Sequence, residues 1–210
     1  GLPSNEVYFM IQDSRGMLWF STEQGICRFN GYEFTRPVDT SATATSSKFQ
    51  IVEDAKHRIW FMNLDVSLSF IENDTVHPAI LPDRPEAYKK NNTTYRFAIG
   101  TDGSIWLPSR AYGILILKPD STQQVVQSGS LNTIVFTEVN GNVLTSIWKK
   151  NETDKQRKAN GEMIHWQNGH ATSLGSFPVL PPTGLGSGPT VMTRLKNGDF
   201  IGCHGHTCYI

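Results

Sequence analysis

The sharpest chemical cluster of the sequence lies near its C-terminal end, where two thiols and two imidazoles stand close together as Cys203, His204, His206 and Cys208. These are ligand types that zinc prefers. The spacing argues against zinc, because structural zinc sites draw their ligands from two separated pairs, and neighbours such as Cys203 and His204 face opposite sides of a strand. Three interpretations stay open: two buried thiols, a disulfide between Cys203 and Cys208, and a metal site.

A small polar ligand such as a sugar or a carboxylate would need hydrogen-bonding groups on loops of a rigid scaffold. The candidate ligand-binding residues are Arg110, Tyr112, His204 and His206. We assign no catalytic residue, because no nucleophile–base pair or carboxylate pair can be placed by its spacing. The glycine-rich run 184–189 lacks the lysine and the strand-to-helix context of a phosphate-binding loop. We therefore expect no cofactor, and we assign no metal residues because the spacing of the cluster 203–208 argues against zinc.

Charge and hydropathy exclude several classes of protein. The 210 residues contain 19 Lys+Arg and 19 Asp+Glu, a balance that argues against binding nucleic acid or an anionic membrane surface. No apolar run approaches the roughly 20 residues of a membrane span. Three cysteines are too few to staple a chain of this size, and they leave the redox compartment open. As given, the chain is expected to be soluble.

The sequence repeats itself. Each unit has an apolar strand, a tight turn, a second strand that carries tryptophan in the first three copies, and a third strand. Aligned on one turn position, the copies are spaced by 41, 46, 38 and 57 residues, at Gly16, His57, Gly103, Gly141 and Gly198. The first three spacings bracket the roughly 40 to 50 residues of a propeller blade. The apolar runs are short, rich in β-branched and aromatic residues, and bounded by hairpin turns.

These patterns predict an all-β fold, a β-propeller of about five four-stranded blades. The expected blades are residues 1–47, 48–95, 96–133, 134–189 and an incomplete 190–210. Trp19, Trp60 and Trp106 are expected to pack between blades, whereas Trp148 and Trp166 fall outside that position and are the freer pair. His57 stands where the other copies have glycine, so we expect its turn to adapt.

Two sets of turns should lie on opposite faces of such a fold. The turns Asp13–Gly16, Ala55–Arg58 and Asp102–Ser104 share one face. The turns between second and third strands share the other, together with the connections 36–48, 82–96 and 118–133 and an insertion at 149–161. The second face contains the candidate ligand-binding residues, and we expect the ligand there.

Residues 1–34 resemble a known repeat. The opening Gly1–Val7, the run from Ile11 to Gly25 with its turn and tryptophan, and Arg28-Phe29-Asn30-Gly31 follow, in order, the pattern of the two-component regulator propeller. Units two and three keep the aspartate-and-tryptophan half of this pattern, and the last two are recognisable mainly by spacing.

The resemblance implies an extracytoplasmic, ligand-sensing region of a bacterial sensor histidine kinase, including hybrid sensor–regulators of two-component phosphorelays. The family usually closes seven blades into a ring, followed by further β domains, a membrane span and a kinase core. It implies here an incomplete ring on the periplasmic side, with kinase chemistry and membrane attachment in regions outside this chain. An unclosed propeller exposes sheet edges, so we expect self-association, or dimerisation of the parent.

Two other functions stay open. Thr101–Leu107 is similar to a unit of streptogramin-lyase-like propellers, enzymes in which His204 or His206 would serve the chemistry. A plain protein-interaction propeller without a small ligand is the third hypothesis.

Overall fold

The computed structural model describes residues 1–85, 88, 95–109, 113–126, 134–137, 142–149, 160–167, 170–178, 191–194, 200–204 and 207–209. The elements of this part of the chain are β-strands, which confirms the predicted all-β class. They form five sheets, in each of which antiparallel strands follow one another in chain order.

The strands of each sheet are as follows. Sheet one contains β1 (Val7–Gln12), β2 (Leu18–Thr22), β3 (Gly25–Phe29) and β4 (Phe34–Thr35). Sheet two contains β5 (Lys48–Glu53), β6 (Ile59–Asn63), β7 (Leu68–Glu72) and β8 (Thr75–Pro78). Sheet three contains β9 (Ala98–Ile99), β10 (Ile105–Ser109), β11 (Gly113–Leu117) and β12 (Gln123–Val126). Sheet four contains β13 (Ile134–Thr137), β14 (Val143–Lys149), β15 (Asn160–Gln167) and β16 (His170–Pro178). Sheet five contains β17 (Val191–Arg194), β18 (Phe200–His204) and β19 (Thr207–Tyr209).

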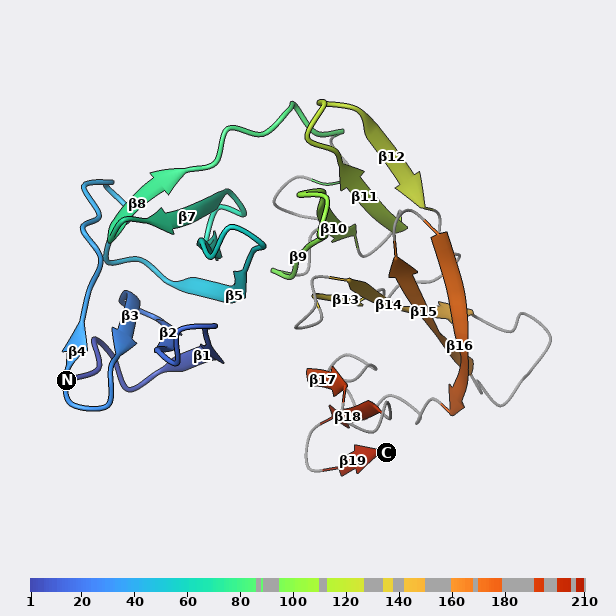
Figure 1. The fold of residues 1–210 in the computed structure, drawn as a ribbon, viewed down its shortest axis with the longest axis horizontal. Coiled ribbons are helices and arrows are strands. Elements are labelled where there is room, and N and C mark those ends of the chain that lie inside the picture. Colours follow the sequence, from blue (N-terminus) through green and yellow to red (C-terminus); the bar gives the residue numbers. More distant parts are fainter. Residues whose placement is uncertain are drawn as a thin grey trace.

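The sheets follow one another around an arc (Figure 1). The first strands β1, β5, β9 and β13 lie toward its centre, and the fourth strands β4, β8, β12 and β16 lie at its periphery. This is the arrangement of propeller blades, and the described sheets do not close a ring, as an incomplete propeller predicts. We therefore refer to the sheets as blades one to five.

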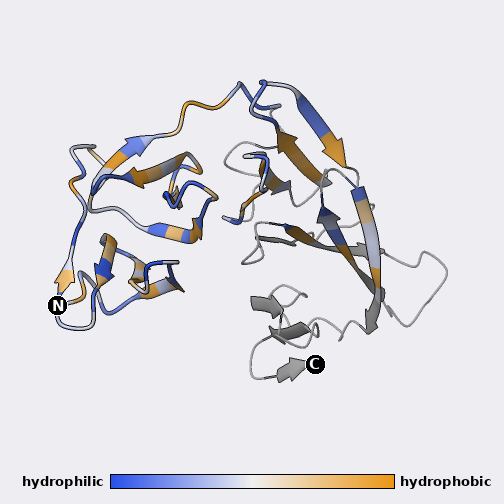
Figure 2. Cartoon of the chain, in the orientation of Figure 1, coloured by the Kyte–Doolittle hydropathy of each residue, from blue (hydrophilic) through white to orange (hydrophobic). Residues whose placement is uncertain are grey.

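The hydrophobic core consists of layers between neighbouring blades. Blades one and two enclose Trp19 with Ile51, Ile59 and Phe61, and blades two and three enclose a larger cluster around Trp60. Figure 2 shows the hydrophobic residues concentrated on strands such as β7 and β11. Trp19, Trp60 and Trp106 are 3%, 7% and 6% exposed, which confirms that the repeated tryptophans pack between blades. Each fully buried large side chain contributes about 1.5 to 3 kcal/mol.

The turn after the first strand has the same hydrogen bonds in three blades. In blade one, Gly16 N donates to Asp13 O at 3.0 Å and Asp13 N donates to Met17 O at 2.9 Å, and the corresponding pairs recur in blades two and three. His57 takes a left-handed φ of 61° at the position where Gly16 and Gly103 have 85° and 80°. The expectation that this turn adapts was wrong, since the backbone is kept and the histidine adopts the glycine-like conformation.

A buried acceptor fixes each repeated tryptophan. Asp13 Oδ2 accepts a hydrogen bond from Trp19 Nε1 at 2.8 Å, and Asp54 Oδ2 accepts one from Trp60 Nε1 at 2.7 Å. Blade three has Gly100 at the aspartate position. There Ser104 Oγ accepts the bond from Trp106 Nε1 at 2.9 Å, so a different residue satisfies the same buried donor.

Two expected connections are partly strand. Residues Gln123–Val126, which we placed in a connection, form β12 and pair with β11. The insertion expected at 149–161 contains fewer residues, because Lys149 ends β14 and its register partner Asn160 begins β15. Short polar strands such as Gln-Gln-Val-Val lack the apolar alternation that would have indicated them.

Candidate functional site

Most of the ligand-binding residues expected from the sequence lie outside the part of the chain that the structure describes. Arg110, Tyr112 and His206 lie outside the described residues. His204 ends β18, but its side chain is outside the described part of the chain. The backbone register of β18 and β19 places Cys203 opposite Cys208, and the three interpretations of these cysteines stay open.

Three aromatic rings from successive blades form a row on the face where we expected a ligand. Tyr8 is in β1, Phe49 is in β5, and Tyr95 lies just before β9. The centroids of Tyr8 and Phe49 are 5.2 Å apart with the rings at 25°, and those of Phe49 and Tyr95 are 4.4 Å apart at 35°. We call these three residues the aromatic row. It crosses two blade boundaries close to the centre of the arc.

The face is identified by the neighbours of the row. Val7, at the start of β1, pairs with Thr22 at the end of β2, beside the turn between the second and third strands. Tyr95 Oη donates a hydrogen bond to the carbonyl oxygen of Leu64, in the corresponding turn of blade two, at 3.4 Å. Tyr8 is 42% exposed, whereas Phe49 and Tyr95 are half-buried. The row thus offers one open ring at the end of a packed stack.

A buried lysine lies next to the row in sequence. Lys48 has no exposed side-chain surface, and its Nζ donates to the carbonyl oxygen of Thr43 at 2.6 Å. Burial lowers the pKa of Lys48, although the carboxylates of Asp39 and Asp65 act in the opposite direction. Its hydrogen bond ties the connection between blades one and two to the first residue of β5, which positions Phe49.

Sequence reasoning missed the row, although a signal exists. Tyr8, Phe49 and Tyr95 each stand five positions before the aspartate position of their unit, occupied by Asp13, Asp54 and Gly100. Only the tryptophans were expected to recur as an aromatic feature of the units. A repeated aromatic residue on the first strand was the missing indication.

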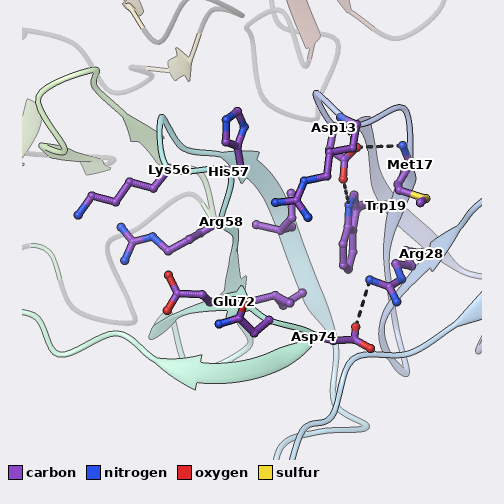
Figure 3. A pocket seen from close by; sticks show the side chains of 13 residues that line it. Asp13, Met17, Trp19, Arg28, Lys56, His57, Arg58, Glu72 and Asp74 are labelled. Atoms are coloured by element: carbon purple, nitrogen blue, oxygen red, sulfur yellow. Dashed lines mark hydrogen bonds and ion pairs between the residues drawn. The ribbon is translucent and has the colours of Figure 1, made fainter.

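A cleft of about 280 Å³ opens between blades one and two on the opposite face (Figure 3). Blade one contributes Trp19 and Arg28 to it, and the turns of blade two contribute Lys56, Arg58 and the hairpin Glu72–Asp74. We call this the inter-blade cleft. The Arg28 guanidinium lies 5.7 Å from the centre of the Trp19 ring, and its Nη1 is 3.2 Å from Asp74 Oδ1.

A clamp between the two blades lies beside this cleft. Ser14 Oγ of blade one is 2.6 Å from Glu53 Oε1 and 2.9 Å from His57 Nδ1, both of blade two. His57 Nδ1 is also 3.2 Å from Glu53 Oε1. A catalytic serine and its carboxylate engage opposite nitrogens of the imidazole. Here both approach Nδ1, so the three residues hold the blades together and do not form a triad.

The carboxylate of Asp54, next to this clamp in the sequence, accepts several hydrogen bonds. Burial acts to raise the pKa of Asp54, but hydrogen bonds from the Arg58 backbone, from Trp60 and from the Arg58 guanidinium bring it below its usual value. Arg58 Nη2 lies 2.7 Å from Asp54 Oδ2, and the same guanidinium stacks over the rings of Trp60 and Phe70. Arg58 is therefore fixed in orientation, with its guanidinium on the side of sheet two that faces blade three.

A second, smaller cleft of about 130 Å³ occupies the corresponding place between blades three and four. Trp106 and Trp166 line it, and their ring centroids are 5.1 Å apart. Trp166 Nε1 also donates to Thr145 Oγ1 at 2.9 Å. The expectation that Trp166 is one of a freer pair was wrong, because this ring packs on the repeated tryptophan of the neighbouring blade. The side chain of Trp148 lies outside the described part of the chain.

Within the described ranges, no three His, Cys, Asp or Glu side chains are grouped so that they could hold a metal ion. Cys27 is buried at 1% exposure, as expected for a core residue, and burial raises its pKa. The described residues contain no helix long and apolar enough to cross a membrane.

Comparison with known proteins supports the resemblance drawn from the sequence. Residues 1–24 match the family described as the two component regulator propeller. The fold is similar to the extracellular domain of a protein assigned as a hybrid two component system from B. thetaiotaomicron, with a TM-score of 0.54 and 14% identity over 96% of this chain and 33% of that one. The extracellular domain of a protein assigned as a one component system from the same organism gives a TM-score of 0.54 and 10% identity over 96% and 31%. No curated protein matches. The chain spans about a third of the length of these solved structures.

Proposed function

We propose that this chain is an extracytoplasmic ligand-sensing propeller module of a two-component sensor whose kinase core lies outside it. The family match at the first repeat and the fold shared with extracellular domains of such systems support this proposal. No catalytic step is assigned to the chain itself. The periplasmic side of a bacterial membrane is the location that this function requires.

The aromatic row is the observation that carries ligand sensing. Exposed aromatic faces stack on the apolar faces of sugar rings, and the carboxylate of Glu6 is 3.1 Å from Tyr8 Oη, where it could accept hydrogen bonds from hydroxyl groups. A small polar ligand, with a carbohydrate as the leading class, therefore suits the Tyr8 end of the row. The loops that hold Arg110, Tyr112, His204 and His206 belong to the same expected face.

Signalling follows from the position of the row across blade boundaries. A ligand that stacks on Tyr8 touches a ring packed on Phe49 of the next blade. Its binding would favour one relative placement of the blades over another, and a ligand shifts an equilibrium only by its differential affinity for the two states. The output would be a changed geometry in a dimeric parent kinase.

The test is calorimetry of the chain against a panel of neutral oligosaccharides. We expect saturable binding of at least one of them, weakened by up to about tenfold by Tyr8→Ala because an aromatic contact is worth about 0.5 to 1.5 kcal/mol. Tyr32 is 95% exposed and lies in the turn between β3 and β4, so Tyr32→Ala is the matched control and should leave affinity unchanged. Equal loss in both variants, or no binding by any saccharide, refutes the row as the sensing site.

The link to a kinase has a separate test, the reading frame on both sides of this segment. A membrane span and a histidine-kinase core downstream would support the sensor assignment. A frame that ends shortly after Ile210 without them would contradict it.

Self-association is part of the proposal. The side of sheet one turned away from blade two presents Met10, which is 57% exposed, and the packed half-buried rings of Phe20, Phe29 and Phe34. Such a face packs on a neighbouring blade in a closed ring, and we propose that a second copy covers it here. Light scattering across micromolar concentrations should give more than the monomer mass, and Met10→Glu should lower it. A monomer at all concentrations overturns this point.

A further inference from the structure

We propose that the saccharide sensed at the Tyr8 end of the aromatic row is an amino sugar, whose protonated amine is bound by the carboxylates of Glu6 and Glu23. The inference rests on the proposed function and names the class of ligand for the same site. An amine and an acetylated amine differ in charge on an otherwise similar sugar. The site should therefore distinguish the two.

A β-bulge in the first strand of blade one presents the open ring of the row. The register of β1 against β2 shifts by one residue between Val7 and Phe9, so Tyr8 is the extra residue of β1. The first strand of blade two has a register shift at the corresponding place, around Phe49. Bulges re-aim a side chain away from the regular alternation of a strand. The orientation of both rings is therefore set by the backbone.

Two carboxylates lie near the hydroxyl group of the open ring. Glu6 and Glu23 are opposite each other where the pairing of β1 with β2 ends, since Glu23 N donates to Glu6 O at 3.1 Å. Tyr8 Oη donates to Glu6 Oε2 at 3.1 Å, and Ser4 Oγ donates to Glu23 Oε2 at 3.4 Å. A hydrogen bond with Ser47 lowers the pKa of Tyr8, but partial burial and both carboxylates raise it more. Both negative charges thus act on the hydroxyl edge of the ring.

Neither carboxylate has a cationic partner in the part of the chain that the structure describes. No Lys, Arg or His there forms an ion pair with Glu6 or Glu23. Lys48, beside the row, has no exposed side-chain surface and donates to the carbonyl oxygen of Thr43. Both glutamates are exposed, so a ligand can reach them. A protonated amine on the ligand would supply a positive charge and the N–H donors that carboxylates accept.

Blade two provides an internal comparison. Aligned on the repeated tryptophans, its positions equivalent to Glu6 and Glu23 hold Ser47 and Leu64, so no carboxylate accompanies the half-buried ring of Phe49 at these positions. The pair of carboxylates therefore belongs to the open end of the row, where a ligand has access, and is not a general property of the repeat.

An amino sugar meets both features of the site. The apolar face of its ring stacks on the exposed face of Tyr8. An amine substituent at the edge of the sugar then lies toward the hydroxyl edge of the tyrosine, where Glu6 and Glu23 accept its hydrogen bonds. A neutral saccharide keeps the stacking and loses the charge contribution.

The test is calorimetry of the chain with oligomers of glucosamine and of N-acetylglucosamine of the same length, at about pH 6, where the glutamates are ionised and the glucosamine amines are protonated. We expect the glucosamine oligomer to bind about fivefold more tightly, and added salt to reduce the difference, because exposed ion pairs are weak and screened. Glu23→Gln should weaken glucosamine binding about two- to threefold and leave N-acetylglucosamine binding unchanged. Glu33→Gln, which removes an exposed carboxylate in the turn between β3 and β4, is the matched control and should change neither.

Equal or weaker affinity for the glucosamine oligomer overturns the inference, and so do equal effects of Glu23→Gln and Glu33→Gln. Because each variant removes one exposed carboxylate, loss of the fold does not explain a difference between them. Binding of the N-acetylglucosamine oligomer without a preference for the amine leaves sensing at the row intact. Failure of both oligomers and of the neutral panel refutes the proposed function itself, so the two proposals fail in different ways.

Discussion

Removing the Asp13 carboxylate should destabilise the fold, mainly because it leaves the buried indole N–H of Trp19 without an acceptor. Asp13 Oδ2 accepts from Trp19 Nε1 at 2.8 Å, and Oδ1 accepts from the backbone N–H groups of Arg15 and Met17 at 2.9 Å each. Asp13 and Trp19 are 9% and 3% exposed. In Asp13→Ala the indole N–H loses its acceptor in a place that water barely reaches, while the turn loses two local hydrogen bonds.

The magnitude follows from these contacts. An unsatisfied buried donor costs about 1 to 3 kcal/mol, and each of the two turn bonds contributes about 0.5 to 1.5 kcal/mol at most, since Arg15 is exposed and water can replace part of its bond. We expect Asp13→Ala to lower the free energy of unfolding by about 2 to 4 kcal/mol. That is a large part of the roughly 5 to 15 kcal/mol typical of a domain.

Urea unfolding followed by far-ultraviolet circular dichroism measures this loss, and a double-mutant cycle isolates the indole bond. Trp19→Phe removes the donor, so Asp13→Ala should cost about 1 to 3 kcal/mol less in that background. Ser104→Ala tests the same bond in blade three, where Trp106 should lose its acceptor. If Asp13→Ala costs the same in the Trp19→Phe background as in the wild-type chain, the indole hydrogen bond does not stabilise the fold and the reasoning fails.

Three further predictions use the same unfolding assay. Gly25→Ala should cost more than Gly31→Ala, because both have left-handed φ but an added Cβ at Gly25 would lie 2.6 Å from the carbonyl oxygen of Ala44, whereas Gly31 faces open space; equal costs would contradict the clash. The pKa of Lys48 is lowered in the folded chain, so the unfolded chain binds this proton more tightly. The free energy of unfolding should therefore rise with pH between the folded pKa and the unfolded value of about 10.4. Lys48→Met should lack this rise, and parallel pH profiles of the two proteins would contradict the contribution of Lys48. The pKa of Asp54 is lowered in the folded chain, so its carboxylate contributes to the free energy of unfolding above the unfolded pKa of about 3.9, and this contribution is lost as the pH falls through the folded pKa. Asp54→Asn should reduce the loss of stability at acid pH, and an unchanged acid profile would contradict the assignment.

The blades could be predicted from the sequence because their signals are local. The strand, turn and tryptophan of each unit lie within a few residues, so Trp19, Trp60 and Trp106 could be assigned to the layers between blades. Trp166 could not, because its position depends on the pairing of β14 with β15, which sets a residue of blade four against Trp106 of blade three. The same holds for β12, a polar strand recognised only by its pairing with β11.

The candidate sites depend on contacts between units, and a single repeat does not reveal these. The aromatic row exists because Tyr8 and Phe49 belong to neighbouring inner strands, and the distance between them in the sequence gives no hint of contact. The cleft arises in the same way, from Arg28 of one blade and Asp74 of the next. Sequence reasoning chose the face for a ligand from its loops, and the charged cleft lies on the other face.

In blade three, Ser104 takes the place of the aspartate as acceptor for the buried tryptophan, and this links the substitutions that blade three can accept. A Cβ added at Gly100 would lie 2.7 Å from both Ser104 Oγ and Asp102 Oδ1, so an aspartate cannot be restored there while Ser104 holds its present position. Ser104 in turn cannot be lost first without leaving the Trp106 indole unsatisfied. Both contacts are with the ends of side chains, so a residue other than glycine at position 100 requires Asp102 and Ser104 to change rotamer with it. The buried indole thus couples three positions of blade three, and copies of one repeat keep the same turn backbone with different local chemistries.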